Sequence, residues 1–142
     1  MDLSYIALNF LPILAATVAG FAFGAVYYIL LRRPYSAATA APGDDHRRSF
    51  TTYALVFALE FWLASILIGA LILAPVEAGL WTVGLGSAFI IWVGFVFPSI
   101  VVNTRLALRP WRLAFIDGFH WLGVMLVMAS VMILIGTTAP AA

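Results

Sequence analysis

The segment YALVFALEFWLASILIGALIL, residues 53–73, carries one ionisable side chain, Glu60, in an otherwise apolar stretch. A helix needs about 20 predominantly apolar residues to cross the hydrocarbon core of a bilayer. Inside lipid the backbone polar groups must pair within the segment, so a spanning segment of this length is helical. We therefore predict that residues 53–73 form a transmembrane helix.

Further apolar runs of comparable length flank this segment, at residues 5–31, 80–102 and 113–136. Hydrophobic residues make up 65% of the chain and charged residues 9%, whereas soluble domains carry about 25% charged residues. The alternation of apolar and polar residues that marks barrel strands is absent. The sequence thus predicts an all-α fold, an integral membrane four-helix bundle that forms a single domain over residues 1–142.

All seven basic side chains other than histidine are arginines, and they fall in two alternate loops. These topology determinants are Arg32, Arg33, Arg47 and Arg48 in the first loop and Arg105, Arg109 and Arg112 in the third. The second loop carries only Glu77, and the C-terminal tail has no charged side chain. Because cytoplasmic loops are enriched in arginine, we expect a protein of the cell inner (plasma) membrane with both termini outside the cytoplasm.

The first arginine loop, at about residues 32–52, has a middle made of small residues. Its stretch Ser36 to Gly43 is rich in alanine and contains a Pro-Gly pair. This composition is typical of a linker without regular structure. We predict a flexible cytoplasmic loop there.

Four polar side chains lie within or at the edges of the predicted helices: Glu60, Asn103, Asp117 and His120. A charged side chain at the bilayer centre costs about 2.5 to 3.5 kcal/mol on insertion scales. Glu60 and His120 lie at similar depth in the arginine-side half of the membrane, and Asp117 is one helical turn from His120. We predict that these side chains form one intramembrane polar cluster.

Such a cluster has three interpretations. The first is structural, in which hydrogen bonds and ion pairs lock the order of the helices. The second is a proton or ion relay, in which a carboxylate and an imidazole titrate inside the membrane. The third is a metal site formed by Glu60, Asp117 and His120. We rank the structural interpretation first and the metal site last, because an Asp-x-x-His spacing alone is a weak motif.

Small and flexible side chains indicate how the helices pack. Gly20 and Gly24 lie one turn apart and form a small face suited to close helix contact, within the molecule or between copies. We favour packing within the molecule. Met125, Met128 and Met132 form a stripe on the fourth helix, which is also typical of packing.

Motifs for chemistry are lacking. The chain has no cysteine, no His-Glu-x-x-His and no glycine-rich phosphate loop, so we predict no catalytic, cofactor-binding or metal-binding residues. A net charge of +1 argues against a nucleic-acid partner. The expected partners are the lipid bilayer and either other membrane-protein subunits or a second copy of the chain.

Several ordered motifs resemble a family of small bacterial membrane proteins. They are Asn9, Pro12, Gly20 and Gly24 in the first helix, then Trp92-Val-Gly-Phe-Val-Phe-Pro98, Asn103, Arg109-Pro-Trp-Arg112 and Ile116-Asp-Gly-Phe-His120. In this pattern the chain is similar to the domain of unknown function family 1761 (DUF1761). The resemblance implies a multipass membrane protein without an established activity, and it implies no site residues.

From these observations we expect a non-enzymatic accessory or structural component of a membrane complex. The alternative is a small proton- or ion-linked transporter that uses the Glu/Asp/His cluster in the cytoplasmic half of the membrane. Four helices offer little room for an enclosed path, so the transporter alternative favours an oligomer.

Overall fold

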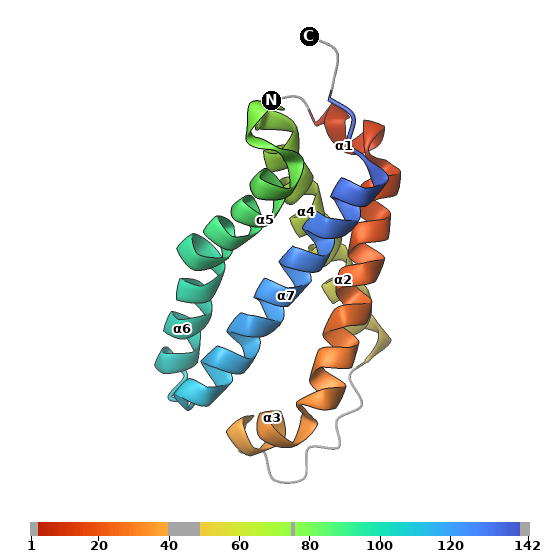
Figure 1. The fold of residues 1–142 in the computed structure, drawn as a ribbon. Coiled ribbons are helices and arrows are strands. Elements are labelled where there is room, and N and C mark those ends of the chain that lie inside the picture. The colour runs from red at the N-terminus through yellow and green to blue at the C-terminus, as the bar shows by residue number, and fades with distance from the viewer. Residues whose placement is uncertain (1–2, 40–48, 75, 140–142) are drawn as a thin grey trace.

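The computed structural model describes residues 3–39, 49–74 and 76–139, and every regular element in these ranges is helical (Figure 1). Four helices are long and apolar enough to cross a membrane. They are α2 at Phe10–Leu30, α4 at Phe50–Leu73, the third span at Leu80–Leu106 and α7 at Trp111–Ile135. The predicted all-α four-helix membrane architecture is thereby confirmed.

Shorter elements complete the fold. Helix α1 covers Ser4–Leu8, α3 covers Arg32–Thr39, and a 3-10 turn, η1, covers Val76–Ala78. The third span consists of α5 at Leu80–Ile91, a π-helical turn, η2, at Trp92–Val96, and α6 at Phe97–Leu106.

The first predicted helix is broken at Asn9, which separates α1 from α2. The buried Asn9 side chain donates from Nδ2 to the carbonyl oxygens of Tyr5 and Thr138, both at 2.8 Å. Its Oδ1 accepts from the Thr138 backbone N–H at 2.7 Å. Thr138 follows α7. The Asn9 side chain therefore joins the start of α2 to the segment after α7, and these two segments lie together in Figure 1.

The first loop is more ordered than the sequence predicted. Its first eight residues form α3, and the buried Ala38 packs with Leu113 and Ile116 of α7. Arg109 Nη1 donates to the Thr39 carbonyl at 2.6 Å, where a cation complements the C-terminal end of a helix. The linker prediction is therefore wrong up to Thr39. Residues 40–48, which include Arg47 and Arg48, lie outside the described residues.

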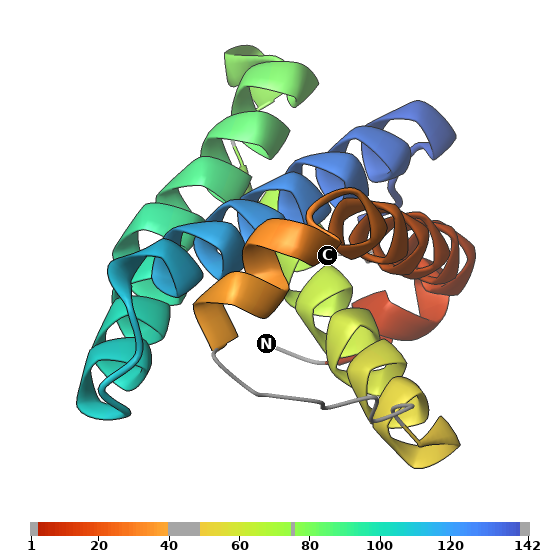
Figure 2. The same ribbon diagram turned by 90° about the horizontal axis from the view of Figure 1, so that it is seen from below.

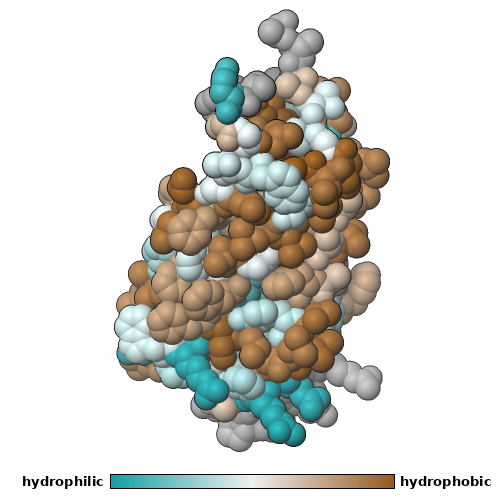
Figure 3. Space-filling view, in the orientation of Figure 1, coloured by the Kyte–Doolittle hydropathy of each residue, from teal (hydrophilic) through white to brown (hydrophobic). Residues whose placement is uncertain are grey.

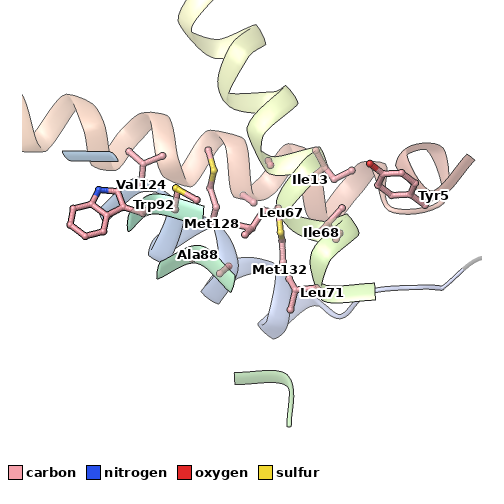
Figure 4. Packing of buried hydrophobic residues seen from close by; sticks show 14 residues of the cluster. Tyr5, Ile13, Leu67, Ile68, Leu71, Ala88, Trp92, Val124, Met128 and Met132 are labelled. Atoms are coloured by element: carbon pink, nitrogen blue, oxygen red, sulfur yellow. The ribbon is translucent and has the colours of Figure 1, made fainter. Parts of the chain in front are cut away.

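Helix α7 is the centre of the bundle and contacts α2, α4 and the third span (Figure 2). The predicted methionine stripe is fully buried in the core, where Met128 and Met132 lie beside Leu67 and Ile68 of α4 (Figure 4). The stripe was predicted to serve packing, and the structure confirms this.

Two glycines let α2 approach α7 closely. A Cβ atom on Gly20 would lie 2.7 Å from Met128 Cε, and one on Gly24 would lie 2.7 Å from His120 Nε2. Both distances are below van der Waals contact, so a side chain at either position would have to displace Met128 or His120. Gly20 and Gly24 thus face α7 of the same chain.

The third span is irregular in the turn before Pro98. Proline lacks the N–H that continues a helical ladder, and the turn Trp92–Val96 widens to the π-helical pattern. The Trp92 indole Nε1 donates to the Gly118 carbonyl at 2.7 Å and so joins this turn to α7. The span packs on α7 along one side and leaves large apolar side chains exposed on the other, such as Ile90, Phe95 and Leu106.

The surface separates into an apolar middle and a hydrophilic end. Figure 3 shows brown, apolar groups over most of the height, with teal groups gathered at the end where α2 gives way to α3 and α7 begins. Arg32, Arg33, Arg105, Arg109 and Arg112 belong to the segments at this end. We call it the arginine end.

We predict that Asn9→Leu, which removes all three hydrogen bonds between Asn9 and its partners, lowers the free energy of unfolding by about 1 to 3 kcal/mol. Denaturant titration in mixed micelles measures this change. Asn103→Leu is the matched control, because Asn103 is exposed on α6, and it should change stability by no more than about 0.5 kcal/mol. Equal effects of the two substitutions would contradict the role of Asn9 as a clamp.

Candidate functional site

A cavity of about 630 Å³ enters the bundle near the arginine end, between α2, α3, α4 and α7. It exists because the first turns of α4 lean away from α2, as Figure 2 shows, so that residues 51–55 are all exposed. Its lining is mostly apolar or aromatic: Phe21, Gly24, Ala25, Tyr28, Ile29, Arg32, Tyr35, Thr52, Tyr53, Val56, Glu60, His120 and Trp121.

Glu60 lies at the inner part of this cavity. It follows Tyr53 by about two helical turns, or about 10 Å along α4, and its side chain is only 2% exposed. The carboxyl atom Oε2 is buried and has no hydrogen-bond partner among the described residues. A buried polar atom without a partner costs about 1 to 3 kcal/mol, so its position beside a cavity calls for an explanation.

His120 reaches the same cavity from α7. Its ring lies against Gly24, where any side chain would collide with Nε2, and it packs on the Tyr28 ring with centroids 4.6 Å apart. The side chain is 6% exposed, and Nδ1 is buried without a hydrogen-bond partner in the described part of the chain. Two ionisable side chains with unpaired polar atoms therefore line one cavity.

Asp117 occupies a different environment. Its Oδ1 accepts a hydrogen bond of 2.8 Å from the Tyr28 hydroxyl, and it does not line the cavity. The neighbouring Tyr27 hydroxyl donates to the Ile116 carbonyl at 2.9 Å. These two bonds fix the arginine-side end of α2 against α7.

The predicted polar cluster is thus divided. Glu60 and His120 share the cavity, Asp117 belongs to the hydrogen bonds between α2 and α7, and Asn103 is exposed on α6. The metal alternative is not supported, because among the described residues no three His, Asp or Glu side chains come close enough to hold an ion. The sequence predicted that these residues lie at similar depth in the membrane, but depth alone does not determine which faces of the helices meet.

Tyrosines form the part of the site that sequence reasoning missed. Tyr27, Tyr28, Tyr35 and Tyr53 lie near a membrane boundary, which is also where aromatic belts occur. In the structure Tyr28, Tyr35 and Tyr53 line the cavity. A tyrosine hydroxyl within a predicted span demands a partner, and this is the signal that could have identified Tyr27 and Tyr28.

Two of the described arginines hold the arginine end together. The Arg105 guanidinium lies over the Trp111 ring at 5.1 Å, and its Nη1 donates to the Arg109 carbonyl at 2.6 Å. Arg109 in turn bonds to the end of α3. Arg32 differs, because it is exposed and lies on the rim of the cavity.

Residues 11–133 match the family described as "Protein of unknown function (DUF1761)". The chain belongs to this family. The matched region includes both Glu60 and His120 and nearly all of the four membrane-length helices. No curated protein and no solved structure matches the chain. Membership in DUF1761 therefore agrees with a multipass membrane protein.

We predict that Tyr28→Phe and Asp117→Asn each destabilise the protein by about 1 to 3 kcal/mol, because each weakens the same charge-assisted hydrogen bond. The double variant should lose less than the sum of the two, with a coupling of at least about 0.5 kcal/mol. A double-mutant cycle on unfolding free energies measures this.

The control cycle pairs Glu60→Gln with Asp117→Asn. Its effects should add, because Glu60 faces the cavity and Asp117 does not. Strong coupling between Glu60 and Asp117 would show that both belong to one polar cluster. It would contradict the conclusion that the predicted cluster is divided.

Proposed function

We propose that this DUF1761 protein is a small solute-binding membrane protein of the transporter class, whose cavity receives its solute from the arginine end. One observation carries the proposal: a cavity of about 630 Å³ is lined at its inner part by two buried ionisable side chains with unpaired polar atoms. Ligand sites have this character, with volumes of roughly 300 to 1,000 Å³, mainly apolar walls and a few convergent polar groups.

The unpaired atoms favour this function over a structural cluster. In a structural cluster Glu60 and His120 would be expected to satisfy each other or Asp117, because an unpaired buried polar atom is costly in a low-dielectric interior. Instead both side chains line the cavity, and a rotation of either one towards it would let water or a solute supply the missing hydrogen bonds. The site therefore accepts a cost in stability that binding would offset.

The proton-linked form of the proposal assigns the exchangeable proton to Glu60, with His120 beside it. Intramembrane ionisable groups that face a water-filled cavity commonly mark proton or ion pathways. The titratable or charged side chains that face Glu60 around this cavity are Tyr28, Arg32, Tyr35, Tyr53 and His120. None of them is a second carboxylate, so we propose that the solute and the proton both bind to Glu60.

The accessory or structural role, which the sequence favoured, has weaker support. Its best argument is the third span, whose exposed apolar face suits a partner helix. That face suits lipid equally well. We also propose binding rather than catalysis.

We further propose that the arginine end faces the cytoplasm of a bacterial inner membrane and that both ends of the chain face outward. The arginine bias between alternate loops supports this orientation. The cavity would then open to the cytoplasm.

Single cysteines test the cavity and the orientation together, since the chain has no cysteine of its own. We predict that a small impermeant methanethiosulfonate reagent modifies Ala37→Cys and Val56→Cys only from the cytoplasmic side, and Ala78→Cys only from outside. Ala37 and Ala78 are exposed at opposite ends of the bundle, and Val56 lines the cavity. Inverted and right-side-out vesicles give the two directions of access.

Leu55→Cys and Leu59→Cys are the matched controls, because these residues flank Val56 on α4 and are exposed outside the cavity, where lipid would surround them. Their reaction should be at least about tenfold slower, since the thiolate that reacts forms in water. If Val56→Cys reacts as slowly as these two, the cavity is not open to water and the proposed function fails. Modification of Ala37→Cys from outside would invert the orientation.

A further inference from the structure

We propose that the solute is an organic cation, with an ammonium group that binds Glu60 and an apolar or aromatic body that contacts the cavity wall. This inference rests on the proposed function and names the chemical class of the ligand. Three features of the cavity lead to it: the kind of atoms left unpaired, the aromatic wall and the distribution of positive charge.

The unpaired atoms call for a donor. Glu60 Oε2 as a carboxylate oxygen accepts hydrogen bonds, and His120 Nδ1 accepts one in the neutral tautomer that carries its proton on Nε2. An ammonium group offers several N–H donors and a positive charge, so it can satisfy the carboxylate through a short, charge-assisted bond. An anionic ligand would instead bring a second negative charge to a buried carboxylate.

The wall around these atoms suits a cation with an apolar body. Aromatic rings line the cavity from all four helices that surround it: Phe21, Tyr28, Tyr35, Tyr53 and Trp121. Phe21 and Tyr53 meet edge to face at 6.4 Å across α2 and α4, and Tyr28 and Tyr35 do so at 5.1 Å. Ring faces attract cations, most strongly where water is excluded, and aromatic enclosures recognise substituted ammonium groups.

Positive charge is placed where it does not compete with the ligand. Arg32 is the arginine among the described lining residues, and it lies exposed on the rim, where water screens its charge. Glu60 has no ion-pair partner in the described part of the chain and is nearly fully buried. The inner part of the cavity therefore has a carboxyl group without a resident counter-ion, and a cationic ligand would supply that counter-ion.

Three probes of matched shape test the inference on the purified full-length protein in detergent: phenethylammonium, the neutral phenethyl alcohol and the anionic hydrocinnamate. Isothermal titration calorimetry measures binding. We expect phenethylammonium to bind about ten- to a hundredfold more tightly than the alcohol, as one charge-assisted hydrogen bond allows. Hydrocinnamate should bind more weakly than either.

Glu60→Gln should remove the preference for the cation and leave binding of the alcohol within about twofold, while Glu60→Asp should retain part of it. Glu77→Gln is the matched control, because Glu77 is exposed at the other end of the bundle, and it should bind like the parent. Thermal unfolding of each variant confirms that it is folded before the comparison is made.

Failure of the ligand class and failure of the proposed function are distinguishable. If the alcohol or hydrocinnamate binds as tightly as the cation, or if Glu60→Gln keeps the cation preference, the inference is overturned and solute binding stands. If none of the three probes binds although Val56→Cys reacts with the aqueous reagent, the cation class is likewise rejected. If no probe binds and Val56→Cys is also unreactive, the proposed function itself fails.

Discussion

A polar group inside a membrane protein must find its partner within the protein, and this constraint organises the bundle. Thr17 and Ser65 return their hydroxyls to the carbonyls of Ile13 and Phe61 one turn earlier. Trp92 bonds across to α7, and Asn9 bonds across to the end of the chain. Each of these bonds satisfies a donor that lipid could not. Against this background, the unpaired atoms of Glu60 and His120 stand out among the described residues, and the binding proposal rests on them.

Helix α7 contributes both to the apolar core and to the wall of the cavity. On the half of α7 away from the arginine end, buried methionines fill the space that Gly20 opens on α2. One turn further along α2 towards the arginine end, Gly24 leaves room for an imidazole instead of a thioether. The same close approach of α2 and α7 therefore builds a dry core at one level and places His120 on the wall of the cavity at the next.

The cavity forms where neighbouring helices separate. Helix α4 is buried in its second half, where Ala64, Leu67, Ile68 and Leu71 pack in the core, and exposed in its first turns. The space left beneath those turns is bounded by α3, which Arg109 and the buried Ala38 hold against α7. A linker without structure at this position would have left the mouth of the cavity without Tyr35.

Hydropathy was sufficient to predict the four spans, because a long apolar run has few alternatives to a membrane helix. It also placed Glu60 and His120 at one depth. The grouping of side chains was harder, because depth does not say which way a residue faces around its helix. Asp117 differs from His120 by one turn, yet it bonds to Tyr28 and leaves the cavity to His120. Asn9, where the first helix breaks, bonds to Thr138, which is far away in sequence, and local patterns carry no signal for such a partner.

The central claim is that Glu60 is buried for binding and not for stability. Glu60→Met tests it most directly, since methionine keeps the unbranched shape and removes the carboxyl group. The measurement is the free energy of unfolding in mixed micelles. We predict that Glu60→Met is as stable as the parent or more stable, because an unpaired buried polar group is replaced by an apolar one. A loss of about 1 to 3 kcal/mol, the cost of breaking a satisfied buried hydrogen bond, would show that Glu60 is a structural residue and would contradict this account.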